Sequence, residues 1–189
     1  TETPVRITRH REVKVKDKTR YQLVFNLTPF YPEGGGQVGD TGALIDADGN
    51  RTTILTTRKE NELILHITDR LPAAMTGTFT AQVNMDKRSA TTLNHTATHL
   101  LHEALRDVLG QHVEQKGSLV KDAALRFDFS HFQKVTAEEL LEVEARVNAA
   151  IRENRLRDER RNIPLEEAKS AGAMMLFGEK YGDTVRMIG

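Results

Sequence analysis

The spacing of hydrophobic positions changes near the middle of the chain. From about residue 11 to 85 the apolar residues form short runs rich in β-branched and aromatic side chains, and turn-forming residues separate these runs at positions 46–50 and 58–61. Runs of this kind predict β-strands. Short strands at this spacing predict a small barrel or a strongly curved antiparallel sheet. The runs are YQLVFNL, GALID, TTILTTR, ELILHI and GTFTAQVNM.

From about residue 88 the apolar positions recur with the period of a helix. The first stretch predicts a helix over residues 89–109, and the run AALRFDF after it predicts another strand. The segment TAEE at 136–139 matches a capping box and opens a second long helix, which is expected to continue into the charged stretch RENRLRDERR. One face of this helix carries Leu140, Val143, Val147 and Ile151.

The last part of the chain combines a short helix with a strand. Pro164 is expected at the start of the helix, and YGDTVRMIG predicts a turn that leads into the strand. The pattern as a whole predicts an α+β protein. We expect a small β-barrel lobe that contains a glycine-rich loop over residues 1–86. A helix-rich α+β lobe, with long helices on an antiparallel sheet, is expected over residues 87–189.

Composition and charge restrict the classes of partner. Basic and acidic residues balance at 27 each, so the chain is not a general polyanion binder and any contact with nucleic acid must be local. Local basic clusters lie at positions 14–20, at 87 and 88, and along 152–161. No apolar run approaches the ~20 residues that span a bilayer, so no membrane partner is expected. The chain has no cysteine, which excludes disulfides and is compatible with the cytoplasm.

The segment HTATHLLH at 95–102 places three histidines on one stripe of the predicted helix. His95, His99 and His102 lie with Arg106, opposite the apolar positions of the same helix. These histidines are either solvated polar-face residues or metal ligands, because His-x-x-x-His on a helix lets two imidazoles share one zinc ion. A position in the core is the weaker interpretation. Two ligands are too few for a stable zinc site, so further ligands are needed.

A second informative segment is LTPFYPEGGGQVGDTG at 27–42. Its three consecutive glycines permit positive φ angles, and their amide groups are suited to binding an anion. An ordinary connecting loop is the alternative. The polar residues around the glycines are Thr28, Glu33, Gln37 and Asp40.

Together these two motifs are similar to a known family. GGGQVGDTG followed by NHTATHLLHEALRDVLGQHVEQKGSLV closely resembles the editing domain of alanyl-tRNA synthetases and its free-standing relatives. The resemblance continues through LRFDFSHF, VNAAIREN and IPLEEAKSAGAMMLFGEKYGDTVRMIG. It implies a small β-barrel lobe joined to an α/β lobe that threonyl-tRNA synthetases share.

The resemblance also implies a function. The family's editing domain hydrolyses the ester of tRNA(Ala) that carries serine or glycine, and the parent enzyme ligates alanine to tRNA(Ala) with ATP. The expected partners are the acceptor end of tRNA(Ala) and the remainder of the synthetase chain. A free-standing editing hydrolase and a non-catalytic module that binds the tRNA acceptor are the alternatives.

The resemblance assigns roles to particular residues. The family's zinc site uses HxxxH and a later CxxxH. His95 and His99 match the first pair, and the chain stops at Gly189, before the second pair is expected. We therefore expect weak zinc binding and weak hydrolysis by this chain alone, with His102 and His112 as alternative ligands. The other assigned residues are Gln37, Thr28, Gly35 and Gly36 in catalysis, and Thr28, Asp40 and Gly34 in substrate binding, with the Thr28 hydroxyl contacting the serine hydroxyl.

Overall fold

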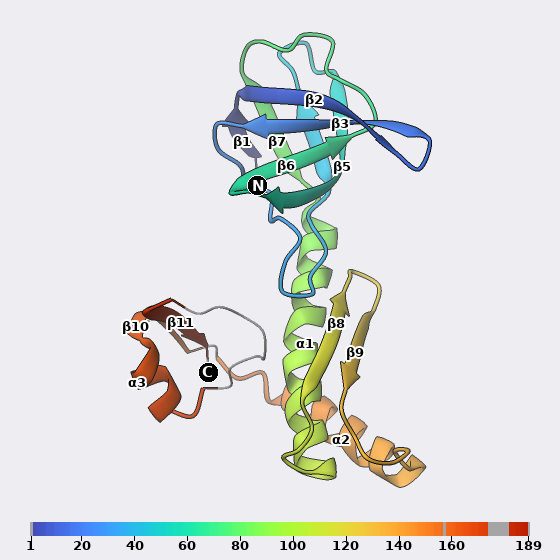
Figure 1. Cartoon of the computed structure of the whole chain (residues 1–189), viewed down its shortest axis with the longest axis vertical. Coiled ribbons are helices and arrows are strands. Elements are labelled where there is room, and N and C mark those ends of the chain that lie inside the picture. Colours follow the sequence, from blue (N-terminus) through green and yellow to red (C-terminus); the bar gives the residue numbers. More distant parts are fainter. Residues whose placement is uncertain (1, 157, 174–181, 189) are drawn as a thin grey trace. The chain divides into compact units, whose positions relative to one another are not determined.

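A computed structural model describes residues 2–156, 158–173 and 182–188. Residues 174–181, which carry part of the family resemblance, lie outside the described residues. The described chain is α+β, as predicted (Figure 1). It divides into two compact units, which we call the first unit (Thr1–Thr98 with Gly117–Phe127) and the second unit (His99–Lys116 with Asp128–Gly189). The strands of the first unit's sheet are β1 (Glu2–Val5), β2 (Ile7–Val15), β3 (Lys18–Phe25), β4 (Gly42–Ile45), β5 (Arg51–Glu60), β6 (Leu63–Thr68) and β7 (Phe79–Val83).

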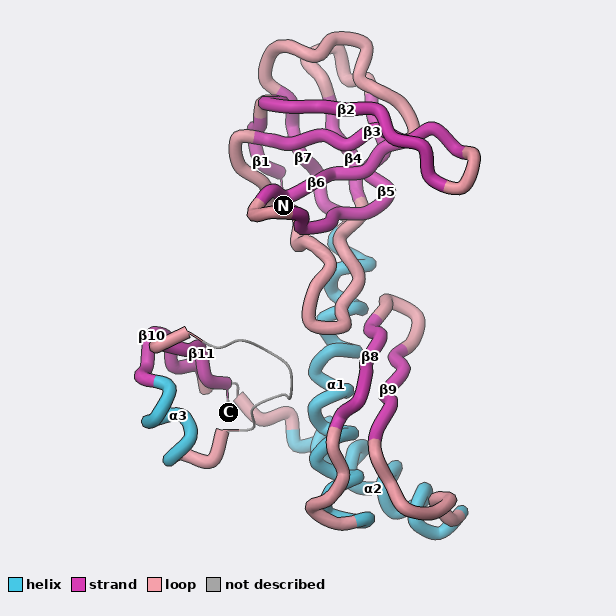
Figure 2. The backbone as a smooth tube through the Cα atoms, in the orientation of Figure 1, coloured by secondary structure: helices cyan, strands magenta, loops and turns pink. Residues whose placement is uncertain are grey.

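These seven strands form one antiparallel sheet in the order β1-β7-β4-β5-β6-β3-β2. Its two edge strands, β1 and β2, are separated in the chain by Arg6 alone. One residue cannot bridge the two edges of a flat seven-stranded sheet, so the sheet must curl until they meet (Figure 2). Arg6 is fixed there, because its N–H donates to Asn26 Oδ1 at 2.7 Å and its carbonyl accepts from Asn26 N at 3.0 Å. The predicted strongly curved antiparallel sheet is therefore present.

The concave face of the curled sheet encloses one hydrophobic core. In β7 every second side chain is buried, which is the period of a strand with one face inside. Burying each large apolar side chain stabilises the fold by roughly 1.5–3 kcal/mol. The buried residues of the cluster are Val5, Leu23, Phe25, Phe30, Leu44, Ile54, Phe79, Ala81 and Val83.

Helix α1 (Met85–Leu109) follows β7 directly. Asn84 caps it, because its Oδ1 accepts from Lys87 N at 3.1 Å, and Gly110 ends it with a φ of 113°. The predicted helix is therefore present and begins four residues earlier than expected. Most of its buried side chains (Thr91, Thr98, His102 and Leu105) follow one another at helical spacing, so they lie on one side of the helix, close to the side of the histidines.

The observed burial differs from the predicted apolar face of this helix at two positions. Leu93, expected on the apolar stripe, is 71% exposed. His102, expected on the polar face, is only 4% exposed, and its Nε2 lies 3.4 Å from the carbonyl oxygen of Val113. The interpretation that disfavoured a core position was thus wrong for His102. A histidine with a backbone partner is easily accommodated in a core.

The second unit contains α2 (Ala137–Glu153), which opens with the predicted capping box: Thr136 Oγ1 accepts from Glu139 N at 3.2 Å, and Glu139 Oε2 accepts from Thr136 N at 2.8 Å. The sequence pattern predicted that this helix continues into the charged stretch at 152–161, but the helix ends after the first two residues of that stretch. Asn154 takes a left-handed conformation and ends it, and β10 (Glu159–Pro164) begins five residues later. The last strand, β11 (Thr184–Ile188), pairs antiparallel with β10.

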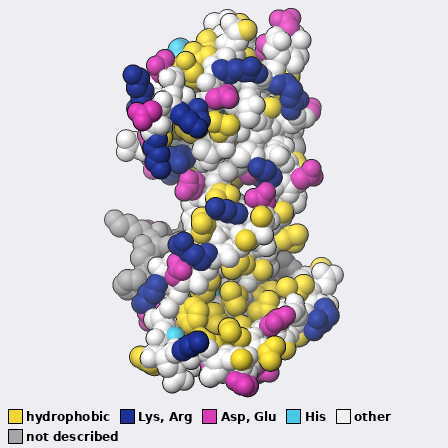
Figure 3. All heavy atoms as spheres, turned by 90° about the vertical axis from the view of Figure 1, so that its right-hand side faces the viewer, with side chains coloured by type: hydrophobic (Ala, Val, Ile, Leu, Met, Phe, Trp, Pro, Cys, Tyr) yellow, Lys and Arg dark blue, Asp and Glu magenta, His cyan; other side chains and the backbone are white. Residues whose placement is uncertain are grey.

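The remaining elements complete the secondary structure. Pro164 directly precedes α3 (Leu165–Ser170), as predicted. Strand β8 (Gln115–Val120), which the sequence pattern did not reveal, pairs with β9 (Leu125–Phe129). Hydrophobic side chains reach the surface in the lower part of the view in Figure 3. Exposed large apolar residues of the second unit include Phe132, Leu140, Leu141, Ile151, Leu156 and Ile188.

Candidate functional site

The glycine-rich segment forms a tight turn in the loop between β3 and β4. Gly34 and Gln37 exchange two backbone hydrogen bonds, of 3.1 and 3.0 Å, and the two residues between them have positive φ angles: 57° at Gly35 and 77° at Gly36. Two central residues with positive φ are typical of a type I′ turn, which disfavours side chains at both positions. The sequence GGGQ therefore encodes the geometry of the turn itself.

Strand β8 holds this turn in place. Gly36 O accepts from Val120 N at 2.8 Å, and Val38 N donates to Val120 O at 3.1 Å. A Cβ atom on Gly36 would collide with Ser118 of the same strand, whereas one on Gly35 would meet no neighbour within 4 Å. Gly36 is therefore required by a close approach of two backbones as well as by its φ angle.

The turn also decides which amide groups can reach a ligand. The N–H of Gly34 and the backbone N–H of Gln37 are used inside the turn. The N–H of Gly34 is therefore already used, and the assignment of Gly34 to substrate binding stays a prediction. The donors that remain for a ligand are the N–H groups of Gly35 and Gly36 and the side-chain amide of Gln37.

Gln37 connects the turn to helix α1. Its side chain is buried, and its Oε1 lies 2.8 Å from Nδ1 of His95. An amide oxygen can only accept, so Nδ1 of His95 carries a proton in this contact. Histidines that bind metals are commonly fixed in this way by a partner on the other nitrogen. His99 follows four residues later on the same helix, has an exposed side chain and is the first residue of the second unit.

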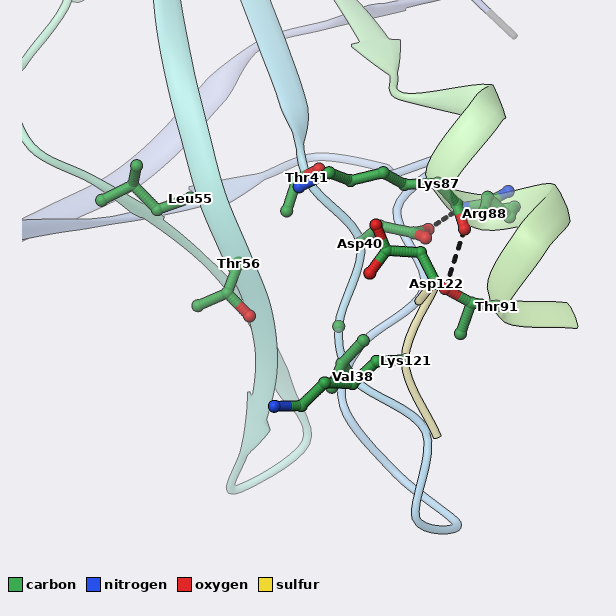
Figure 4. Close-up of a pocket in the computed structure, with 11 residues that line it drawn as sticks. Val38, Asp40, Thr41, Leu55, Thr56, Lys87, Arg88, Thr91, Lys121 and Asp122 are labelled. Atoms are coloured by element: carbon green, nitrogen blue, oxygen red, sulfur yellow. Dashed lines mark hydrogen bonds and ion pairs between the residues drawn. The ribbon is translucent and has the colours of Figure 1, made fainter. Parts of the chain in front are cut away.

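Asp40 holds the loop against the first turns of the helix. Its carboxylate is 95% buried, accepts from Tyr31 N at 2.6 Å and forms an ion pair with Arg88 (Figure 4). Arg88 also donates to the carbonyl oxygen of Pro29 at 2.7 Å, and burial lowers the pKa of its guanidinium. The family resemblance assigned Asp40 to substrate binding. In the structure its carboxylate joins the loop to helix α1.

A pocket of about 170 Å³ lies beside this ion pair (Figure 4). Its walls come from the segment after the turn, from β5, from the first turns of α1 and from the residues after β8. Its lining carries three cations and two carboxylates, and one of the cations, Arg88, is already paired with Asp40. The lining residues are Val38, Gly39, Asp40, Thr41, Leu55, Thr56, Lys87, Arg88, Thr91, Lys121 and Asp122.

Thr28 was expected on the strand that leads into the glycine loop. It lies three residues beyond the end of β3, in the loop itself. Its Oγ1 accepts from Phe30 N at 3.1 Å and lies 2.7 Å from Nε2 of His66 on β6. His66 is fully buried, its ring stacks on Phe25 with centroids 3.9 Å apart, and burial lowers its pKa to about 4. Sequence reasoning missed His66, and the available signal was a histidine inside the apolar run ELILHI.

Comparison with known proteins shows what this chain is similar to. Residues 4–89 match the family of class II (A) tRNA synthetases. Over its whole length the chain is similar to alanine–tRNA ligases, which confirms the resemblance to the alanyl-tRNA synthetase family. The identity is 60% with the enzyme of Cytophaga hutchinsonii over 97% of this chain, 58% with that of Bacteroides fragilis over 100%, and 54% with that of Porphyromonas gingivalis over 100%.

The chain spans about a fifth of the length of these relatives, covering 21%, 21% and 22% of them respectively. Of the helices that the structure describes, none has the length and apolar character needed to cross a membrane.

Proposed function

We propose that this chain forms the part of an alanine–tRNA ligase that hydrolyses the ester of tRNA(Ala) carrying serine or glycine. The hydrogen bond between His95 and Gln37 carries the proposal, since it joins the helix motif to the glycine turn in one place. The complete domain would have a small β-barrel lobe and an α/β lobe. The parent enzyme would ligate alanine to tRNA(Ala) with ATP.

Hydrolysis of an ester needs a nucleophilic water and donors for the developing oxyanion. The donors we assign are the side-chain amide of Gln37 and the N–H groups of Gly35 and Gly36. His95 accounts for the orientation of Gln37: its Nδ1–H occupies the amide oxygen, so the amide NH₂ is the part that faces a ligand. A preorganised donor of this kind is typically worth 10²–10³ in rate.

Zinc fits the residues at this place. The tautomer of His95 leaves Nε2 as the metal-binding nitrogen, and His99 lies on the same helix four residues away. When bound, zinc would polarise the ester or lower the pKa of a water. No group of three or more candidate ligands occurs within the described ranges, so we expect weak binding by this chain alone.

Thr28 is our candidate for recognition of the serine hydroxyl, which alanine lacks. A second hydrolytic site that hydrogen-bonds this hydroxyl would remove serine, which a synthetic site for alanine cannot fully reject. The backbone of the tRNA acceptor end carries phosphates, and Lys87 and Lys121 at the pocket are our candidates for one of its contacts.

The test is deacylation of purified Ser-tRNA(Ala) and Gly-tRNA(Ala) by the full-length ligase, with ATP omitted so that recharging does not mask hydrolysis. The Gln37→Leu variant should lose about 10²-fold in rate on both esters, because both share the carbonyl. Glu62→Ala, at an exposed hairpin residue, serves as the matched control and should retain the original rate. Absence of hydrolysis by the original enzyme, or equal rates for Gln37→Leu and Glu62→Ala, would contradict the proposal.

A further inference from the structure

The imidazole of His66 is buried among groups that carry no charge. It is 0% exposed on β6, between the stacked ring of Phe25 and the edge of Phe30, whose centroid lies 5.4 Å away. Its two nitrogens face Leu23 O at 3.0 Å and Thr28 Oγ1 at 2.7 Å. Neither partner carries a charge, so an imidazolium at this place would be strongly disfavoured.

The partners determine where every proton lies. A carbonyl oxygen can only accept, so the contact with Leu23 O requires the proton on Nδ1. The neutral ring then has a lone pair on Nε2, and the Thr28 hydroxyl must donate to it. Burial lowers the pKa of His66 to about 4, so this arrangement persists throughout the neutral range.

These contacts use most of the hydrogen-bonding capacity of the Thr28 hydroxyl. Its single hydrogen points to His66, and one of its two lone pairs accepts from Phe30 N–H at 3.1 Å. What remains is one lone pair on a partly exposed side chain. Towards any ligand, the oxygen of Thr28 can act as an acceptor and not as a donor.

We propose that His66 is a positioning residue that makes Thr28 a selector for hydrogen-bond donors, and that the group selected is the hydroxyl of a serine ester. This inference rests on the proposed function and deepens it. A serine hydroxyl can donate to Thr28, whereas a fluorine atom of nearly the same size can only accept. Glycine offers neither group, so its hydrolysis does not depend on this contact.

The experiment compares three chemically acylated tRNA(Ala) substrates, carrying serine, 3-fluoroalanine or glycine, with the full-length ligase in the absence of ATP. The original enzyme should hydrolyse the serine ester at least about tenfold faster than the fluoroalanine ester, in line with one hydrogen bond in a dry site. His66→Phe keeps an aromatic ring against Phe25 but removes the acceptor. It should bring the serine-to-fluoroalanine ratio close to one and leave glycine hydrolysis within about twofold.

A double-mutant cycle separates positioning from general damage. Thr28→Val should lower the same ratio, and the combined variant should be no worse than either single variant, because both remove one shared interaction. Additive losses, or equal losses on all three esters, would overturn the role of His66. If no ester is hydrolysed by the original enzyme, the proposed function fails and the selector role fails with it.

The tautomer of His66 can be measured on the original 189-residue chain, without any variant. Nitrogen NMR shifts of His66 should report a neutral ring protonated at Nδ1 at pH 7. Replacement of Thr28 by Val should shift the Nε2 resonance towards that of an unbonded lone pair. A ring protonated at Nε2 would overturn the proposal whatever the hydrolysis rates are.

Discussion

Several single residues of the first unit have their protonation or tautomer assigned by their neighbours. Gln37 offers an oxygen to His95, and Leu23 offers one to His66, so both rings are protonated at Nδ1. The two histidines then differ in surroundings: His95 is half-buried beside the glycine turn, whereas His66 is fully buried among aromatic rings. The same residue type therefore faces a glutamine side chain in one place and serves as a fixed acceptor in the other.

The buried His66 makes the stability of the fold depend on pH. Its pKa is about 4 in the folded chain, below the ordinary value of 6.5, so the unfolded chain takes up the proton first as pH falls. The contribution of the neutral His66 to the free energy of unfolding is therefore fully present above pH 6.5. It is lost as the pH falls towards 4, by on the order of 3 kcal/mol over that window. Urea unfolding followed by circular dichroism between pH 7.5 and 4.5 measures this loss.

The His66→Phe variant is the reference for this measurement, because it differs from the original chain at this titratable group alone. The free energy of unfolding of the original chain should fall more steeply with decreasing pH than that of the variant. Parallel curves for the two proteins would mean that His66 is not held neutral by burial.

At the level of elements, the glycine turn is placed by two neighbours, β8 and α1. Strand β8 binds its backbone through Gly36 and Val120, and helix α1 reaches it through His95 and Arg88. Each contact can be removed separately, so the two supports can be tested independently.

The two glycines with positive φ differ in what a side chain would meet. Gly35→Ala places a methyl group in open space and should cost about 1 kcal/mol of stability for the left-handed backbone alone. Gly36→Ala adds a collision with Ser118 and should cost roughly 1–3 kcal/mol more, with displacement of the turn from β8. Urea unfolding of the two variants tests this order. A Ser118→Gly change should restore part of the loss in Gly36→Ala and none in Gly35→Ala, and equal losses for both alanines would contradict the account.

The ion pair between Asp40 and Arg88 joins the loop to the helix at a largely buried place. Asp40→Ala leaves the guanidinium without its carboxylate and should cost about 3–5 kcal/mol of stability. The matched control is Arg58→Ala at the exposed pair with Glu33, whose side chains are 58% and 54% exposed; it should cost less than about 1 kcal/mol. Similar losses for the two variants, measured by urea unfolding, would show that burial does not strengthen the first pair.

At the scale of the molecule, the elements that the sequence predicted are those whose pattern is local. The sequence predicted the strands in the middle of the sheet, helix α1 and the capping box of α2. Hydrophobic periodicity and capping depend on residues that are close in the sequence, so a local pattern reveals them. The first ten residues and β8 were missed as strands, because few of their side chains are buried and neither segment shows the alternating apolar pattern of a half-buried strand.

The site was predictable to a similar degree. The glycine turn and the histidine motif are visible in the sequence, and their contact through Gln37 and His95 was expected only from the family resemblance. The burial of His102 could not be foreseen, because most of the buried side of helix α1 is formed by polar side chains, Thr91 and Thr98 among them, and not by the predicted apolar stripe. The pairing of His66 with Thr28 joins positions 38 residues apart and follows from the register of the sheet.

Metal content tests the whole-molecule proposal. His95 and His99 supply two imidazoles, whereas a durable zinc site needs three or four protein ligands. Much of the binding energy of structural zinc comes from a closed ligand shell, so water must complete the shell in this chain and the ion should exchange readily. After dialysis the 189-residue chain should hold far less than one zinc per molecule, whereas the full-length ligase, which we expect to contribute a CxxxH segment, should hold about one. His95→Ala in the full-length ligase should remove the metal, while Glu62→Ala should not. Metal analysis by mass spectrometry decides it: near one zinc in the dialysed 189-residue chain would mean that a third ligand such as His102 or His112 completes the site.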